Sequence, residues 1–154
     1  MKKFLAILGG IFGVIIIAVL ILAVISIPRS IKLDKQATAY IQNTVPEIVG
    51  SWNAQALIDR ATPELASSMK SSADTGRIFT MFQQLGALKH LDKPTGHITS
   101  GASSKTGPIT IGSYVAQADF EKGKATISIQ LRRSGNSWEI NGFHVDSDVF
   151  LKKT

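Results

Sequence analysis

The most extended pattern in the chain is an uninterrupted apolar segment, Phe4 to Ile27, which contains no charged residue. Of its 24 positions, 17 are Ile, Leu, Val or Phe. As a helix it would be roughly 36 Å long, enough to cross a hydrocarbon core of about 30 Å. Its apolar side chains together favour insertion by on the order of 5 to 10 kcal/mol. The pattern therefore predicts a transmembrane anchor over residues 4–27.

The polar residues around this segment define the other boundaries. Residues 1–3 are expected to form a tail, residues 28–33 a linker, and residues 34–151 a separate domain. A cleaved secretory signal is the alternative, because the chain starts with a positively charged stretch. The apolar part of a signal is about 7 to 15 residues long and ends at a small-residue cleavage site, whereas this run is longer and precedes Pro28. We therefore expect an uncleaved anchor.

The charges beside the anchor predict its orientation. Lys2, Lys3 and the α-amino group favour a cytoplasmic N-terminus. Arg29, Lys32 and Lys35 lie beyond the other end and compete with them. Because the N-terminal tail is so short, we expect it to stay in the cytoplasm while the rest is exported. The sequence thus predicts a single-pass protein of the cell (inner) membrane with an extracytoplasmic C-terminal domain.

The first part of this domain has a helical period. Apolar residues spaced by three or four predict a helix over residues 34–51, bent at Pro46. Asn53 is a suitable cap for a second short helix, and a third is expected to start at Pro63 after a threonine cap. A fourth is predicted over residues 75–91. The residues expected to be buried are Ala37, Ile41, Val45, Ile48 and Trp52, then Leu57 and Ile58, then Ile78, Met81, Phe82, Leu85 and Leu88.

From His97 onward the period changes to two, which predicts antiparallel strands with one buried and one polar face. The strand over residues 125–131 is the clearest, another is expected over residues 109–120, and a third begins near Trp138. Residues 100–107 are small and polar, and we expect them to form an exposed loop. The buried face should carry Tyr114, Ala116, Ala118, Phe120, Ala125, Ile127, Ile129, Leu131, Trp138, Ile140, Phe143 and Val145.

Two breaks in the alternation predict β-bulges, each caused by one extra residue. In the last strand the apolar positions resume one residue late, so a bulge is expected at Asn141 and Gly142. A similar slip before Tyr114 predicts a second bulge at Gly112 and Ser113. Bulges bend strands, so the sheet should be curved.

Helices followed by a bent antiparallel meander resemble the nuclear transport factor two-like (cystatin-like) superfamily. The most specific part is the hairpin FEKGKATISIQLRRSGNSWEINGFHV, residues 120–145, and the resemblance covers about residues 34–149. It implies a curved sheet wrapped around a long helix as a cone. The expected fold class is therefore α+β, with an N-terminal transmembrane helix followed by helices packed on a curved antiparallel sheet in a cystatin-like roll.

The resemblance also implies where chemistry would be found. The superfamily includes enzymes such as ketosteroid isomerases, whose cone interior holds an acid or a base. On the expected inner face of this chain, Tyr114 is the only hydrogen-bonding side chain besides the Trp138 indole, so no acid–base dyad is predicted. A pocket inside the cone would be lined by Tyr114, Phe120, Trp138 and Phe143.

Metal and cofactor chemistry have no sequence signal in this chain. The three histidines show no metal-ligand spacing, and the absence of cysteine excludes thiolate sites and disulfides. No phosphate-binding glycine motif is present. We therefore expect no catalytic residue, no cofactor and no bound metal.

Charge argues against nucleic acid as a partner. The net charge of +6 is concentrated near the anchor: from Asp34 onward, 13 basic and 11 acidic residues leave only +2. A nucleic-acid site requires a clustered basic face, which this balance does not suggest. The expected partners are the lipid bilayer, through residues 4–27, and an envelope protein or a second copy of the chain.

These observations predict a membrane-anchored extracytoplasmic binding or scaffold module rather than an enzyme. The motivating pattern is a complete domain on an anchor with no visible catalytic group. The alternative is a small apolar-ligand binding protein, or a cryptic enzyme, that uses the aromatic interior of the cone.

Small residues on one face of the anchor suggest that it self-associates. Gly9 and Gly13 form a G-x-x-x-G motif, which lets two membrane helices approach closely. Replacing both glycines by isoleucine should abolish self-association in a membrane reporter assay, because the larger side chains would separate the helices. An unchanged reporter signal would remove this helix-dimer face from consideration.

Overall fold

The computed structural model of the chain describes residues 30–103 and 107–151. The chain divides into two compact units, Met1–Leu33 and Asp34–Thr154, and every strand belongs to the second. The predicted anchor over residues 4–27, with its two glycines, lies outside the described residues. Within the described ranges, no helix has the length and apolar character needed to span a membrane.

Helices occupy the first part of the second unit. A long helix is described over residues 30–51 and runs without a break through Pro46, so the proline does not divide it. Trp52 then adopts a positive φ of 46° and turns the chain. The following helices are α2 (Ala54–Ile58), α3 (Pro63–Ser71), α4 (Thr75–Phe82) and the short 3-10 helix η1 (Gln83–Leu85).

The predicted caps of α2 and α3 are confirmed. The Asn53 side chain accepts a hydrogen bond from the backbone N–H of Gln55 at 2.9 Å. The Thr62 hydroxyl accepts one from the backbone N–H of Leu65 at 3.4 Å, and Pro63 occupies the first helical position. Both caps satisfy backbone donors that have no partner inside the helix.

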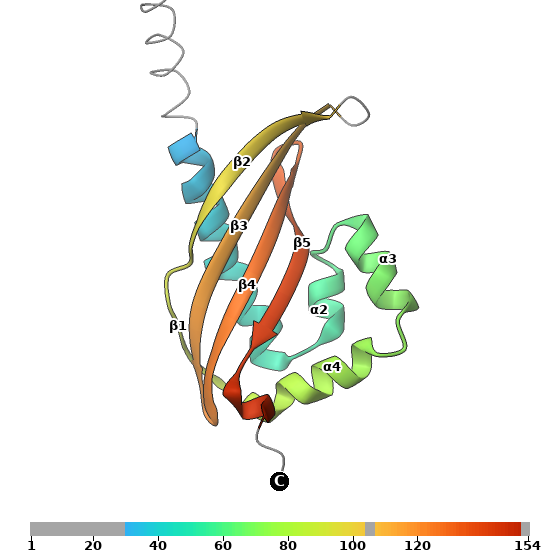
Figure 1. The fold of residues 1–154 in the computed structure, drawn as a ribbon, viewed down its shortest axis with the longest axis vertical. Helices are drawn as coiled ribbons and strands as arrows, with labels where there is room; N and C mark the ends of the chain where they lie inside the picture. The colour runs from blue at the N-terminus through green and yellow to red at the C-terminus, as the bar shows by residue number, and fades with distance from the viewer. Residues whose placement is uncertain (1–29, 104–106, 152–154) are drawn as a thin grey trace, which may run out of the picture. The chain divides into compact units, whose positions relative to one another are not determined.

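The remaining chain forms a curved antiparallel sheet of five strands (Figure 1). The strand order is β1-β3-β4-β5, and β2 also pairs with β3. Because both β1 and β2 pair with β3 on the side away from β4, they follow each other along one edge. The strands are β1 (Leu88–Leu91), β2 (Thr95–Ser103), β3 (Gly107–Phe120), β4 (Gly123–Ser134) and β5 (Ser137–Asp146), followed by the 3-10 helix η2 (Asp148–Leu151).

The core lies between the long helix and one face of the sheet, here called the inner face. The long helix runs behind the strands, while α2, α3 and α4 lie beside β5 (Figure 1). Every residue that the helical pattern predicted as buried in the long helix is buried, and so is the predicted inner face except Phe143, which is half-buried. The inner face includes Tyr114, Ala116, Ala118, Phe120, Ala125, Ile127, Ile129, Leu131, Trp138, Ile140 and Val145.

One of the two predicted bulges is confirmed. Gln130 pairs with Gly142 while the next residue, Leu131, pairs with Ile140, so Asn141 is the extra residue in β5. The bulge predicted at Gly112 is wrong, because β3 pairs continuously with both neighbours there. The alternation is preserved because Gly112 takes an inner-face position and the Tyr114 ring occupies the space its side chain would fill.

The predicted helix over residues 75–91 is wrong in its second half. It ends at Leu85, and Leu88–Leu91 form strand β1 instead. The expected stripe is confirmed in part: Phe82 and Leu85 are buried, and so is Phe79, whereas Ile78 and Met81 are 44% and 36% exposed.

Gly86 and the β3–β4 turn explain why the helix stops. Gly86 has a φ of 76°, a conformation that other residues rarely adopt. The β3–β4 turn then forms hydrogen bonds with the segment after η1. A Glu121 carboxylate oxygen in this turn accepts from the backbone N–H of Ala87 at 3.0 Å. The backbone N–H of Lys122 donates to the carbonyl of Leu85 at 3.1 Å. These contacts with a segment 34 or more residues away replace the helical hydrogen bonds.

The predicted loop over residues 100–107 is also shorter than expected. Residues 100–103 continue β2, and Gly107 already belongs to β3. The small polar residues are therefore part of a long hairpin, because backbone pairing does not require large side chains.

The close approach of β2 to Tyr114 leads to a stability prediction. A Cβ atom at Gly96 would lie 2.0 Å from the Ser113 carbonyl oxygen, whereas one at Gly101, in the same strand, would meet no atom within 4 Å. Gly96→Ala should lower the free energy of unfolding by about 2 to 4 kcal/mol, because backbone must move. Gly101→Ala should change it by less than about 0.5 kcal/mol. The measurement is denaturant unfolding of the full-length chain, monitored by tryptophan fluorescence. Equal free energies of unfolding for the two variants would contradict the prediction.

Candidate functional site

The four residues predicted to line a cone pocket lie on the inner face of the sheet. Tyr114, Phe120 and Trp138 are 2%, 4% and 8% exposed. Phe143 is half-buried and pairs with the buried Ile129 of β4. The structure therefore gathers all four on the face that the long helix covers.

Phe120 belongs to an aromatic cluster that joins the end of β3 to the helices. Its ring stacks on Trp52, with ring centres 5.5 Å apart and an interplanar angle of 29°. Trp52 in turn contacts Phe82 at 5.2 Å, and Phe82 contacts Phe79 and Phe150 at 5.7 and 5.8 Å. Such pairs stabilise a core beyond the burial of area alone. The space next to the Phe120 ring is thus occupied by side chains of the same chain.

Trp138 lies at the opposite end of the inner face, beneath a charged side chain. The Arg133 guanidinium is 5.6 Å from the Trp138 ring centre, within the range of a cation–π contact. Arg133 also donates to the Gln36 side chain of the long helix at 3.0 Å. The buried indole N–H groups of Trp52 and Trp138 find no acceptor among the described residues. Arg133 therefore closes this end of the inner face.

Tyr114 forms the polar contact of the inner face that sequence reasoning missed. Its hydroxyl donates to the Asp34 carboxylate at 2.7 Å. Burial, and next the hydrogen bond to Asp34, raise the pKa of Tyr114 well above its usual value. The hydroxyl thus stays protonated and links the long helix to the sheet. The two residues are 80 positions apart, so no local pattern could have paired them.

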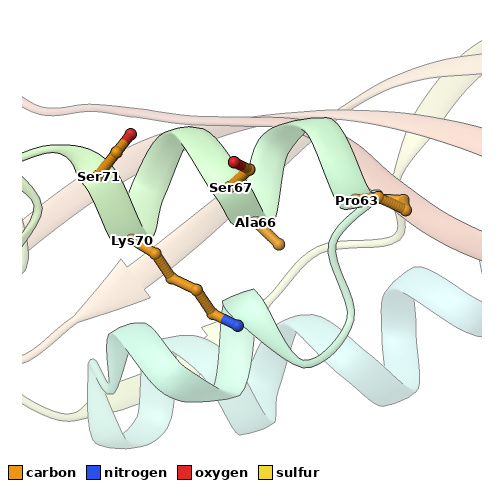
Figure 2. A pocket seen from close by; sticks show the side chains of 5 residues that line it. All are labelled: Pro63, Ala66, Ser67, Lys70 and Ser71. Atoms are coloured by element: carbon orange, nitrogen blue, oxygen red, sulfur yellow. The ribbon is translucent and has the colours of Figure 1, made fainter.

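A shallow groove lies along α3, away from the inner face. Figure 2 shows Lys70 and Ala66 pointing to one side of the helix, and Ser67 and Ser71 to the other. The groove is lined by Pro63, Ala66, Ser67, Lys70 and Ser71, and none of the four predicted pocket residues takes part. α3 has no fully buried residue, so this groove is an exposed helix surface with a single charged group.

Apart from the Tyr114–Asp34 contact, the ion pairs of the described residues lie at the surface. Arg132 contacts Glu64 at 3.0 Å and Glu139 at 3.7 Å, and the Arg132 hydrogen bond lowers the pKa of Glu64. His90 is exposed and lies 3.0 Å from Asp92. In the part of the chain that the structure describes, no three residues of the types that ligate metals come together.

No known protein family, curated protein or solved structure matches this chain.

The Tyr114–Asp34 contact predicts a loss of stability at alkaline pH. In the unfolded chain Tyr114 should titrate near pH 10, whereas in the folded chain its raised pKa keeps it protonated. Its contribution is therefore complete below about pH 10 and is lost as pH rises above that value. Tyr114→Phe should cost about 1 to 2 kcal/mol at neutral pH, because the Asp34 carboxylate loses its partner.

The same variant should also make stability less sensitive to alkaline pH. Removing one proton-linked group reduces the slope above pH 10 by up to about 1.4 kcal/mol per pH unit. The measurement is denaturant unfolding of the full-length chain between pH 7 and 11.5. Identical slopes for the variant and the parent would show that Tyr114 titrates normally. Tyr40→Phe is the comparison variant. Because burial also raises the pKa of Tyr40, this variant should likewise reduce the slope of stability against pH.

Proposed function

We propose that the chain is a membrane-anchored extracytoplasmic binding or scaffold module. Residues 4–27 would hold it in the cell (inner) membrane, and the domain of residues 34–151 would present a surface to a partner. The uncharged apolar run of 24 residues supports the anchor. An anchor confines a weak binding surface to two dimensions, which raises its effective concentration toward other membrane proteins.

The observation that carries this proposal is the difference between the two faces of the sheet. The inner face is filled by the core, whereas the opposite face, here called the outer face, carries polar side chains. Val115 is 40% exposed at the centre of this face. Strand register places the following residues there with it: Thr95, His97, Ser113, Gln117, Thr126, Ser128, Gln130, His144 and Asp146. A broad, uncovered sheet face suits a macromolecular partner better than a small ligand.

A second candidate function is the binding of a small apolar ligand inside the cone. The aromatic residues Tyr114, Phe120, Trp138 and Phe143 favour it, and the Tyr114 hydroxyl would supply a polar group. The stacking of Phe120 on Trp52 supports the scaffold instead, because a ligand would have to displace this contact. Thermal-shift screening with lipids and steroid-like compounds distinguishes the two, since a ligand inside the core would raise the melting temperature.

Membership of the nuclear transport factor two-like superfamily remains part of the proposal. Helices that precede a curved antiparallel sheet, and the bulge at Asn141, support it. The Tyr114–Asp34 contact gives the inner face one carboxylate, but the tyrosine hydroxyl already binds it. This arrangement supports a structural role for the pair and a non-enzymatic module.

Site-specific photo-crosslinking in the native cell tests the proposal. A crosslinking amino acid at Gln117, exposed on the outer face, should give a specific adduct with an envelope protein. The same group at Gln42, exposed on the long helix, is the matched control and should give none. Membrane fractionation and protease protection of the full-length chain check the anchor and its orientation. A soluble chain, or equal adducts from both positions, would contradict the proposal.

A further inference from the structure

The two edges of the sheet differ in whether another segment of the chain pairs with them. At the β5 edge, the backbone N–H of Thr62 donates to the carbonyl of Ile140, and the N–H of Ile140 donates to the carbonyl of Arg60, both at 2.8 Å. Residues 60–62 therefore act as a short extra strand beside the middle of β5. α2 and α3, which flank this segment, lie along the same edge (Figure 1). This edge is blocked for further strand pairing.

The opposite edge, along β2, is not covered by any of the residues that the structure describes. This strand pairs with β3 without a bulge from Thr95↔Val115 to Ser103↔Gly107. In an edge strand, alternate residues direct their N–H and C=O groups away from the sheet. Among the described residues, those outward groups of β2 accept and donate no hydrogen bond. Residues 95–102 are exposed except for the half-buried Ile98, so a partner strand can reach the edge.

The composition of β2 lacks the features that normally protect an edge strand. Proteins block exposed edges with lysine, proline, bulges or very short strands. The neighbouring β1 has several of these, since it is four residues long, contains Lys89 and pairs irregularly. β2 has nine residues, no charge and no proline. Of the two strands on this edge, β1 and β2, β2 is therefore the one suited to pairing with another strand.

We propose that β2 pairs antiparallel with β2 of a second copy of this chain, joining two sheets into one. An antiparallel pair of identical strands is related by a twofold axis perpendicular to the sheet, so each copy offers the same surface. Because the β5 edge is blocked, the assembly closes at two copies and does not extend into a fibre. The register that pairs the whole strand centres on Thr99, the middle residue of β2.

Self-pairing fits the charge of the strand better than pairing with a charged peptide. Two copies of β2 bring no like charges together, because none of the nine residues is Asp, Glu, Lys or Arg. In the proposed register, His97 faces Gly101 of the other copy, which leaves room for the imidazole. A charged partner would find no complementary side chain on β2.

The twofold axis keeps the inner faces of both copies, and with them the long helices, on the same side of the joined sheet. The β2 pairing itself depends only on the open edge, whereas a contribution of the anchor depends on the proposed function. The anchor would favour the pairing by confining both copies to one plane.

Cysteine cross-linking of the full-length chain tests the register directly, because the natural chain contains no cysteine. Thr99→Cys should form a covalent dimer on mild oxidation, since side chains directly opposite each other in an antiparallel pair have Cβ atoms about 4.5 to 5.5 Å apart. Gln117→Cys, exposed on the same face but away from the edge, is the matched control and should stay monomeric on a denaturing gel. Equal cross-linking of the two variants, or an adduct of Thr99→Cys with another protein only, would overturn the proposal.

Charge substitution tests whether the pairing holds the assembly together. The double variant His97→Lys, Thr99→Lys places four positive charges side by side at the junction and should weaken self-association at least about tenfold. Gln117→Lys, Gln130→Lys adds the same charge to exposed outer-face positions and should leave it unchanged. Analytical ultracentrifugation of the full-length chain in detergent measures both, and circular dichroism confirms that each variant is folded. Unchanged association of the β2 variant would overturn the proposal.

Further comparisons separate this inference from the membrane proposal. Both tests are repeated in the Gly9→Ile, Gly13→Ile background, so that contact between anchors cannot substitute for β2 pairing. A chain that fractionates as soluble but still cross-links through Thr99→Cys would contradict the anchor and support the β2 junction. A membrane-bound chain that does not cross-link would contradict the junction and leave the anchor supported.

Discussion

The burial of the inner face of the sheet against the long helix is the interaction on which the rest of the domain depends. Ile41 and Ile48 of the helix, and Ile127, Leu131 and Ile140 of the sheet, are at most 1% exposed. Each such side chain contributes about 1.5 to 3 kcal/mol when fully buried, whereas an exposed ion pair such as Arg132–Glu64 contributes about 0 to 1 kcal/mol. Apolar burial therefore determines where the helix lies. The polar contacts between helix and sheet, Tyr114 with Asp34 and Arg133 with Gln36, fasten the first turns of the helix to a core that is already defined.

This arrangement limits what the domain can do chemically. The aromatic side chains that would line a cone pocket are used for packing, and Phe120 stacks on Trp52 from the turn after the long helix. The inner-face hydroxyl of Tyr114 is bound to the carboxylate of Asp34. Within the described residues, the polar outer face and the β2 edge, where backbone groups can bind another strand, are surfaces that the core does not use. The proposed scaffold function follows from the difference between a filled face and an open face, and the proposed strand pairing follows from the difference between a blocked edge and an open edge.

The edges of the sheet are as important as its faces. Residues 60–62 cover the middle of β5, and the turn at Glu121 binds the segment after η1, so two pairs of segments that are distant in sequence hold each other in place. In the part of the chain that the structure describes, no segment covers β2 in this way. A sheet with one blocked edge and one open edge can join a second copy only once, which is why pairing through β2 would give a dimer.

Several features of this protein could be predicted from the sequence because they depend on local periodicity. The caps at Asn53 and Thr62, the buried stripe of the long helix, the alternation in β3 and β4 and the bulge at Asn141 each involve residues close together in the chain. Wherever a distant segment competes with the local pattern, only the tertiary structure decided the outcome. The Glu121 turn ends the fourth helix and makes Leu88–Leu91 a strand, the Tyr114 ring fills the space beside Gly112, and β3 draws residues 100–103 into β2. The hydrogen bond of Tyr114 to Asp34 and the open edge of β2 were likewise decided by the tertiary structure. Local sequence determines which faces are apolar, but the free energy of long-range contacts determines which backbone groups and side chains meet.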